Sequence, residues 1–337
     1  MACLVLVFIA MLGIGGLPLR ADGAAAPRKI VVAYAAMNAR VAALWVARER
    51  GFFIKNGFDA DPLFVRGAPT LVAAMTSGEI DVGYTGGTAV VGAVASGADF
   101  KILSALNNRI TYELVVKPSI KTPQDLKGKR FGIQAIGGTV WMGGLLGLEH
   151  LGLDPDRDKI SVIAVGDQVV MAQALASGTI DAAVLDGVLA RPLNAKGFPT
   201  LVDLSKANLP LLSNAVVVRD PYLHKNPELL EGVLKAIIEG AAFALSPTQK
   251  PATLKVLQKY LRISEKEAEE GYKDMVVGYD RKPYASAAGV NNIVRFMKAR
   301  NPTVEKVKAA ELIDDRLLKK LDQSGFIDET YAKYGVK

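Results

Sequence analysis

The stretch MTSGEIDVGYTGGTAVV (Met75–Val91) decides the fold. It combines a helix that ends at Gly78, a short apolar strand and the start of a second helix, which is the unit from which α/β proteins are built. A related stretch, LASGTIDAAV (Leu175–Val184), repeats its Ser, Gly, Ile and Asp 100 residues further along the chain. The repeat predicts two α/β lobes of similar construction.

The tripeptide Gly-Gly-Thr ends the strand of this stretch and occurs once more, in AIGGTVWM (Ala135–Met142). Ligands of open parallel sheets bind beyond the carboxyl ends of the strands, where helix N-termini offer free backbone N–H groups. We therefore expect the two turns to occupy corresponding places in the two lobes and to hold one ligand between them. The alternative is that both are ordinary folding turns. Neither has the spacing of a dinucleotide fingerprint or a P-loop.

The rest of the pattern completes an α/β fold of two lobes. Residues 29–36 form an apolar run typical of a buried strand, and Asn38 is a suitable cap for a helix over 39–51. Extended segments over 101–119 and 209–221 predict two crossover strands between the lobes. After Pro221 the pattern is mostly helical, which predicts a helical C-terminal tail.

Length and composition limit the class of protein. The chain has 337 residues and a net charge of +7, but its Lys and Arg are scattered, so nucleic acid is not a favoured partner. The apolar segment Cys3–Leu17, followed by small residues, predicts a Sec-type signal peptide over 1–26 and a periplasmic location. Cys3 is the only cysteine, so we expect a monomer without disulfides.

Three segments in combination resemble a known family: ARERGFF (Ala47–Phe53), SGEIDVG (Ser77–Gly83) and DLKGKRFG (Asp125–Gly132). The chain is similar to the periplasmic solute-binding proteins of ABC importers, in particular the nitrate/sulfonate/taurine-binding group, also called the NMT1/THI5-like or SsuA-type proteins. The resemblance implies a two-lobed, type II-like periplasmic-binding-protein fold that closes on a ligand by hinge motion. It also implies an ABC permease and ATPase as partners.

The resemblance and the turns together give lobe limits and a candidate ligand site. Lobe 1 is expected over 28–112 and 215–337, and lobe 2 over 113–214. Ligand contacts in such proteins come from the loops that follow the strands and from the crossovers. Carried over by position, the candidate ligand-binding residues are Met37, Asn38, Tyr84, Thr85, Gly87, Thr88, Asn108, Thr139, Val140, Trp141, Asp186 and Asn214.

Several of these residues have a second interpretation. Asp186 either contacts the ligand or caps the following helix, and Trp141 either lines the cleft or belongs to the core. Arg109 is either a hinge cation or solvated. The sequence shows no cluster of arginines at the predicted cleft, which favours a singly charged anion with an organic body.

The expected function is the capture of a small organic anion for an ABC importer. Sulfonates, nitrate-like anions, aromatic carboxylates and thiamin-pyrimidine precursors all remain open as ligands. Alternatives are a thiamin-pyrimidine-precursor binding or biosynthesis protein of the same fold, and a periplasmic sensor or adaptor without a transport role. We expect that the protein is not an enzyme and that it has no cofactor site and no metal site. His150 and His224 resemble ordinary helix-end residues, and no catalytic motif is present.

Overall fold

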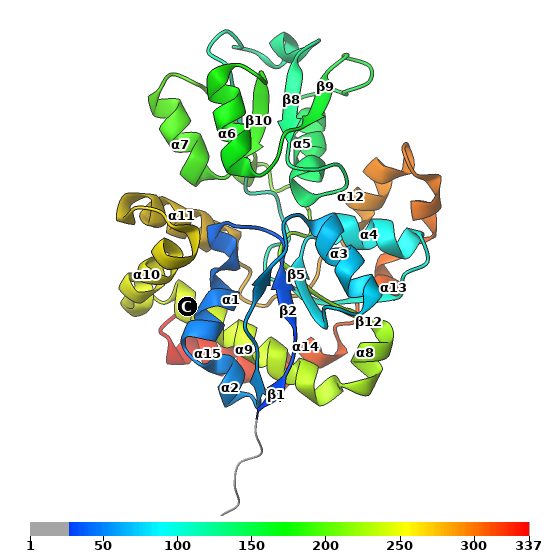
Figure 1. The fold of residues 1–337 in the computed structure, drawn as a ribbon, viewed down its shortest axis with the longest axis vertical. Coiled ribbons are helices and arrows are strands. Elements are labelled where there is room, and N and C mark those ends of the chain that lie inside the picture. Colours follow the sequence, from blue (N-terminus) through cyan, green and yellow to red (C-terminus); the bar gives the residue numbers. More distant parts are fainter. Residues whose placement is uncertain (1–26, 337) are drawn as a thin grey trace, which may run out of the picture.

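The computed structural model describes residues 27–336, and the predicted signal peptide lies outside these residues. Two five-stranded sheets form the two lobes, one below the other in Figure 1. The sheet of lobe 1 has the order β4-β2-β5-β12-β6. Its strands are β2 (Val32–Tyr34), β4 (Leu63–Phe64), β5 (Val82–Thr85), β6 (Phe100–Ala105) and β12 (Ala215–Arg219), and a small outlying pair consists of β1 (Arg28–Lys29) and β3 (Phe58–Asp59).

The sheet of lobe 2 has the order β11-β7-β10-β8-β9. Read from the other edge, as β9-β8-β10-β7-β11, it matches the order of lobe 1 strand by strand. Its strands are β7 (Glu113–Val116), β8 (Arg130–Ile133), β9 (Ser161–Ala164), β10 (Ala182–Leu185) and β11 (Thr200–Asp203). In each sheet one strand runs antiparallel to its neighbours, namely β12 in lobe 1 and β7 in lobe 2, and each is the strand by which the chain enters from the other lobe. The predicted two-lobed α/β fold is confirmed.

The common strand order shows which parts of the two lobes correspond. β8 takes the place of β2, and β10 takes the place of β5. The first Gly-Gly-Thr turn follows β5, whereas the second follows β8. The expectation that the two turns occupy corresponding places is therefore wrong. The counterpart of Gly86–Thr88 is the turn that begins at Asp186, 100 residues later, in the same register as the repeat.

The repeated Ser-Gly-x-Ile-Asp segment has the same structural role in both lobes. Gly78 and Gly178 end helices α3 (Ala68–Ser77) and α6 (Gln168–Ser177) in the left-handed conformation, with φ of 88° and 82°. The carboxylate of Asp81 accepts the backbone N–H of Val31 at 2.9 Å, and that of Asp181 accepts the N–H of Arg130 at 2.9 Å. The repeat thus ties the start of β2 to the turn before β5 in lobe 1, and the start of β8 to the turn before β10 in lobe 2.

Asp181 also binds two cations, which makes lobe 2 sensitive to acid. Arg130 donates to it at 2.9 Å and Lys117 at 2.6 Å. The hydrogen bonds from Arg130, helped by the one from Lys117, hold the pKa of the Asp181 carboxyl well below its ordinary value, although burial opposes them. A depressed carboxyl pKa stabilises the fold above the unfolded-state pKa of about 3.9, and that contribution is lost as the pH falls further.

We expect Asp181→Asn to lower the free energy of unfolding at pH 7 by about 1.5–3 kcal/mol, because hydrogen bonds to a charged group are lost. The variant should then lose less further stability than the parent below about pH 4. Asp81→Asn is the matched control, since Asp81 forms no ion pair within residues 27–336. Urea unfolding at pH 7 and pH 3.5 measures both effects, and equal losses for the two variants would contradict this role of Asp181.

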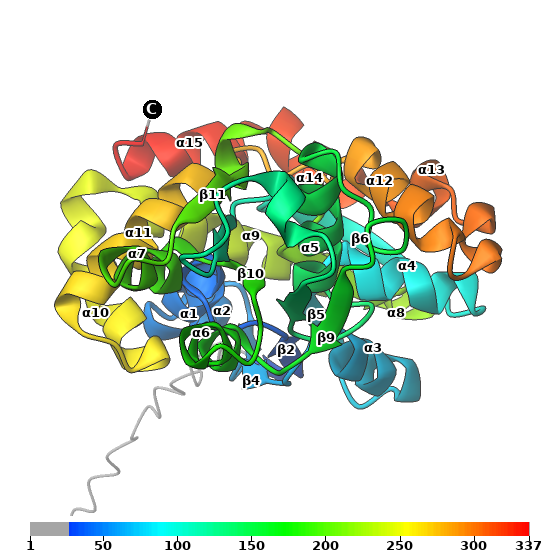
Figure 2. The same cartoon turned by 90° about the horizontal axis from the view of Figure 1, so that it is seen from above.

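Helices cover both faces of each sheet. In lobe 2, α6 and α7 lie on one side and α5 on the other (Figure 2). The C-terminal part of the chain is helical and packs around lobe 1, as predicted (Figure 1). The other helices are α1 (Ala42–Glu49), α2 (Phe52–Lys55), α4 (Gly87–Ala95), α5 (Thr139–His150), α7 (Gly187–Ala195), α8 (Asp220–Lys225), α9 (Pro227–Leu245), α10 (Lys250–Leu261), α11 (Glu265–Gly278), α12 (Ala287–Lys298), α13 (Ala309–Leu312), α14 (Arg316–Gln323) and α15 (Phe326–Lys333).

The two crossovers run side by side as a hydrogen-bonded pair. Leu211 donates its N–H to the carbonyl of Asn108, and Ile110 donates to that of Leu209, both at 3.0 Å. β7 and β12 begin at Glu113 and Ala215. These are the first residues that the sequence assigned to lobe 2 and to the second part of lobe 1, and the exact lobe limits stay a prediction.

Both tryptophans are buried. Trp45 is fully buried and stacks on Tyr260, with ring centroids 4.9 Å apart, as expected of a core residue. Trp141 is 4% exposed and belongs to a buried apolar cluster. Within residues 27–336, no helix combines the length and the apolar character that a membrane span requires.

Candidate ligand-binding site

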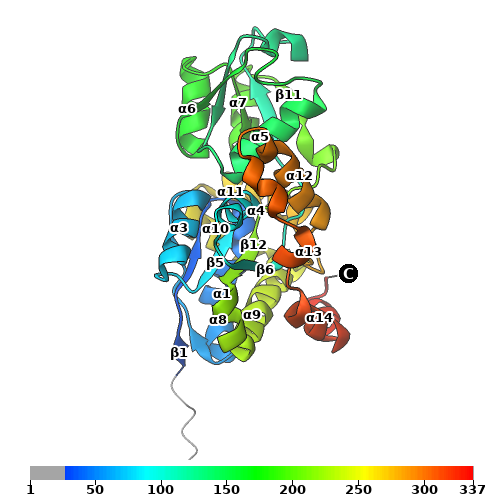
Figure 3. The ribbon, with the colours of Figure 1, turned by 90° about the vertical axis from the view of Figure 1, so that its right-hand side faces the viewer.

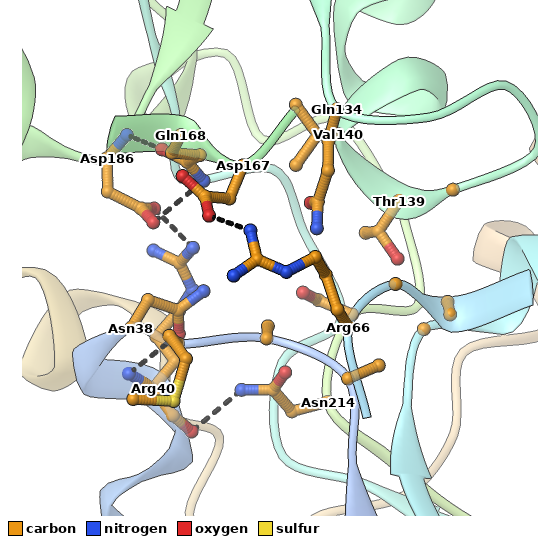
Figure 4. A pocket seen from close by; sticks show the side chains of 18 of the residues that line it. Asn38, Arg40, Arg66, Gln134, Thr139, Val140, Asp167, Gln168, Asp186 and Asn214 are labelled. Carbon is orange, nitrogen blue, oxygen red and sulfur yellow. Dashed lines mark hydrogen bonds and ion pairs between the residues drawn. The ribbon is translucent and has the colours of Figure 1, made fainter. Parts of the chain in front are cut away.

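A cavity of about 440 Å³ lies between the two lobes (Figure 4). Its walls are the loops that follow β2, β4 and β5 in lobe 1 and the loops that follow β8, β9 and β10 in lobe 2. The loop between α10 and α11 and the second crossover complete it. This volume is in the range of small-molecule sites in proteins, about 300–1,000 Å³.

Most of the residues expected in the site line this cavity. They come from both lobes, so the structure brings together side chains that are more than 100 residues apart in the sequence. The predicted residues that line it are Met37, Asn38, Tyr84, Thr85, Thr139, Val140, Asp186 and Asn214.

Gly87 and Thr88 do not line this cavity. Both belong to α4, which turns away from the cleft after Gly86. The N–H of Gly87 donates to the carbonyl of Leu212 at 3.1 Å, and a Cβ at Gly87 would lie 2.9 Å from the Leu212 side chain. Thr88 is fully buried on the side of α4 that faces a different cavity.

Asn108 and Trp141 are structural instead. The Asn108 amide donates to the carbonyl of Tyr284 at 2.8 Å and to Asp280 at 3.0 Å, while its oxygen accepts the N–H of Ser286 at 2.8 Å. These bonds tie the first crossover to the C-terminal part of the chain and leave the side chain no bond for a ligand. Of the two interpretations of Trp141, the core one is correct.

Arg109 is paired, although its side chain stays 31% exposed. Its guanidinium donates to Asp280 at 2.9 Å and to the carbonyl of Val277 at 2.9 Å. The first crossover is therefore anchored to the segment after α11 by both Asn108 and Arg109.

A buried ion pair between Arg40 and Asp186 crosses the cavity from lobe 1 to lobe 2 (Figure 4). Arg40 is 2% exposed and Asp186 is 6% exposed. Gln168 fixes the carboxylate further, donating to it at 2.8 Å and accepting the Asp186 N–H at 2.6 Å. Burial alone would lower the pKa of Arg40, but the adjacent carboxylate of Asp186 outweighs it and raises that pKa above the ordinary value. The Asp186 side chain therefore does not cap α7, and it is paired with Arg40.

The Arg40 backbone is held as firmly as its side chain. Asn38 caps the short 3₁₀ turn at Ala39–Val41 by accepting the Arg40 N–H at 3.1 Å, which confirms its predicted capping role. The carbonyl of Arg40 accepts hydrogen bonds from Asn214 at 2.7 Å and from Tyr279 at 2.8 Å. Its guanidinium lies over the ring of Tyr112 at 5.2 Å, and burial raises the pKa of that phenol to about 12, so it stays neutral.

Three arginines line the cavity, contrary to the expectation that no arginine cluster would be found there. Besides Arg40, Arg66 reaches across to Asp167 of lobe 2 and forms an exposed ion pair (Figure 4). The third, Arg262, lies in the α10–α11 loop and forms no ion pair within residues 27–336. Only Arg262 is therefore left without an acidic partner. Arg191 of α7 does not line the cavity and pairs with Glu270 at 2.7 Å.

Residues that line the cavity from both lobes carry hydrogen-bond donors without acceptors. The Thr85 hydroxyl is buried and has no hydrogen-bond partner. Opposite it, α5 begins at Thr139 with no side-chain cap, so its first N–H groups are free. The two lobes touch at this point, because a Cβ at Gly86 would lie 1.8 Å from the Thr139 hydroxyl oxygen. Although the turns do not correspond, they do face each other.

Further ion pairs join the lobes on both sides of the cleft. On one side Arg191 of α7 binds Asp274 of α11 at 2.6 Å. On the other side Arg295 of α12 binds Glu149 of α5, with N–O distances of 2.5 and 2.9 Å, where α12 rises beside α5 (Figure 3). The C-terminal helices α11 and α12 thus link the two lobes, and α11 also contributes Asp274 to the cavity wall.

Several lining residues were missed from the sequence. Arg66, Gln134, Asp167 and Gln168 all follow strands of the two sheets, so the rule that found Thr139 would have found them if applied to every residue after β4, β8 and β9. Residues 260–263, which also line the cavity, could not be found by this rule, because they lie at the junction of two helices of the C-terminal tail and follow no strand. Within residues 27–336, no group of His, Cys, Asp or Glu side chains has the arrangement of a metal site.

The fold and the interlobe site define the class of periplasmic binding proteins, and comparison with known proteins agrees. Residues 38–250 match the family described as NMT1/THI5 like, and the chain belongs to that family.

Relatives and neighbours of this chain bind small solutes. The taurine-binding periplasmic protein of Escherichia coli (strain K12) is 28% identical over 176 residues, which are 50% of this chain and 52% of that protein. The alkanesulfonate-binding protein SsuA from Xanthomonas axonopodis pv. citri, bound to MOPS, has a TM-score of 0.69 at 19% identity, over 86% of this chain and 99% of that one. The periplasmic nitrate-binding protein NrtA from Synechocystis PCC 6803 has a TM-score of 0.70 at 14% identity, over 92% of each chain.

Proposed function

We propose that this chain is an extracytoplasmic solute-binding protein that holds one small organic anion between its lobes and delivers it to the permease and ATPase of an ABC importer. The observation that carries the proposal is the set of donors without acceptors in the cavity. A buried hydroxyl with no partner costs about 1–3 kcal/mol, which a ligand acceptor would recover. Thr85 supplies such a hydroxyl from lobe 1, and the N-terminus of α5 supplies N–H groups from lobe 2.

The charges of the cavity favour a single negative charge on the ligand. Arg40 and Arg66 are already neutralised by Asp186 and Asp167. The free N–H groups of α5 carry the positive end of the helix dipole, and Arg262 at the cavity mouth adds one full charge. A doubly charged anion would find no second unpaired arginine.

The organic part of the ligand would rest on the apolar walls. Phe64 and Val140 line the cavity from lobe 1 and lobe 2, and Val169 is 54% exposed beside them. An apolar body between these side chains with its anionic group at Thr85 fits the usual pattern of such sites, which are mostly apolar with a few polar groups that orient the ligand.

Location, transport and stoichiometry are part of the same proposal. The apolar segment Cys3–Leu17 favours export, and the taurine-binding relative is named as periplasmic. The paired crossovers would act as the hinge on which a monomer opens and closes.

We expect Thr85→Val to weaken binding of the anion roughly ten- to a hundredfold, because one hydrogen bond to a charged group is lost at nearly constant volume. The ligand-free variant should be as stable as the parent or more stable, since the hydroxyl has no partner in its absence. Calorimetric titration with ethanesulfonate, taurine, benzoate and nitrate, beside a neutral aminopyrimidine, measures the affinities. Thermal unfolding of the ligand-free protein measures stability.

Thr179→Val is the matched control, because Thr179 is exposed and lies outside the cavity. It should bind like the parent. Tighter binding of the aminopyrimidine than of every anion would favour the thiamin-precursor alternative. An unchanged affinity in Thr85→Val would remove that hydroxyl from the site.

A further inference from the structure

A second cavity, of about 290 Å³, lies on the other side of the contact between Gly86 and Thr139. We propose that it is a binding site for an alkyl or aryl group, and that Thr88 binds a hydrogen-bonding atom of that group where it has one, as in an alcohol. Pro69 lines both this cavity and the main one, so the two are neighbours within the same interlobe cleft.

The walls of the second cavity are apolar and come from both lobes. Helices α3 and α4 of lobe 1 contribute Val72, Ala73 and Ala93, and α12 contributes Met297. Lobe 2 contributes Ile136, which is 66% exposed and stands at the rim. A large apolar side chain left in solvent beside an apolar hollow is the arrangement expected of a site that covers an apolar group.

Thr88 provides the one polar group of this site. Its side chain is fully buried, it lines the cavity, and its hydroxyl has no hydrogen-bond partner. Buried hydroxyls in folded proteins are almost always paired, so this one calls for a partner inside the cavity.

The two Gly-Gly-Thr turns separate the two cavities. Gly86 and Thr139 touch each other and face the main cavity, whereas Thr88 and Gly137 face the second. Each turn thus contributes to both sites, which accounts for the residues of the motif that the proposed function does not use.

The volume sets the size of the occupant. An apolar cavity of about 150 Å³ is sufficient for benzene, so 290 Å³ admits a six- to eight-carbon chain or a substituted ring. Such a group is either a separate small molecule or the tail of an anion whose head lies in the main cavity. The second source rests on the proposed function, and the first does not.

Methionine methyl groups report on the two cavities separately, because Met37 lines the main one and Met297 the second. The protein is labelled with ¹³C at its methionine methyls and titrated with 1-hexanol, ethanesulfonate and octanesulfonate. We expect 1-hexanol to shift the Met297 signal and not that of Met37. We expect ethanesulfonate to shift only Met37 and octanesulfonate to shift both.

Two substitutions test the site itself. Ala73→Leu fills the cavity from an exposed helical position, so it should fold normally and abolish the Met297 response to both probes. Ala332→Leu makes the same change on exposed α15 and should have no effect. Thr88→Val should weaken 1-hexanol binding about three- to tenfold, the effect of one lost neutral hydrogen bond.

The outcomes separate the two proposals. If Met297 responds to neither 1-hexanol nor octanesulfonate, or responds equally in Ala73→Leu, no organic group binds in the cavity and the inference is overturned. If Met297 responds to 1-hexanol while Met37 responds to no sulfonate, the second site stands and sulfonate binding fails. If Met37 responds to the sulfonates and Met297 responds to no probe, the proposed function stands and the second site is overturned.

Discussion

Replacing Arg40 by methionine is expected to lower the free energy of unfolding of the ligand-free protein by about 3–5 kcal/mol. The change leaves the Asp186 carboxylate, 6% exposed, without its counter-charge in a low-dielectric site. It also removes the guanidinium from the face of the Tyr112 ring. Urea unfolding of the ligand-free protein at pH 7 measures the loss.

Two further variants identify the cause. Arg66→Met also breaks an arginine–aspartate pair between the lobes, but Arg66 is 67% exposed, so the cost should be below about 1 kcal/mol. In Arg40→Met combined with Asp186→Leu both charges are replaced by apolar groups, and most of the lost stability should return. If Arg40→Met costs no more than Arg66→Met, the pair is not buried in the ligand-free protein and the lobes stand open.

Gly86→Ala is expected to weaken ligand binding roughly ten- to a hundredfold. The backbone at Gly86 has φ −83° and ψ 150°, which alanine adopts without strain. The added Cβ would nevertheless lie 1.8 Å from the Thr139 hydroxyl oxygen, so the lobes cannot approach as closely. Overpacking of this kind costs about 1–3 kcal/mol, and here the cost falls on the closed form alone. Calorimetric titration with the tightest-binding anion measures it.

The test of this explanation is the double variant Gly86→Ala with Thr139→Ala. Removing the Thr139 hydroxyl and methyl leaves only its Cβ, at 3.0 Å, near the new methyl group. The double variant should therefore bind better than the two single effects predict when added. Strict additivity would show that Gly86 acts through something other than its contact with Thr139.

Much of the fold could be predicted because its signals are local. The glycine that ends a helix, the apolar strand that follows and the Asn38 cap each act within a few residues, and the structure places them as expected. The correspondence between the lobes could not be read from the Gly-Gly-Thr tripeptide, because it depends on which strand each turn follows. The repeat at Ser77 and Ser177 has a spacing of 100 residues, and the structure shows that this spacing relates Gly86 to its counterpart Asp186.

The sequence predicted where the site lies better than it predicted the contacts within the site. The rule that ligands bind at the carboxyl ends of parallel strands gave Tyr84 and Thr85 at the end of β5 and Thr139 after β8. The pairing of Arg40 with Asp186 joins residues 146 positions apart, and no local pattern reveals it. Trp141 was misplaced because a residue in the first turn of a helix faces either the cleft or the core, and only the tertiary packing decides which.

The most direct test of the account is a crystal structure of the protein with its tightest-binding organic anion. The account predicts the anionic group between the lobes, within about 2.7–3.2 Å of the Thr85 hydroxyl and of a first-turn N–H of α5, with the Arg40–Asp186 pair intact. An anion held by one lobe only, or one that displaces Asp186 from Arg40 and leaves Thr85 without a partner, would contradict it.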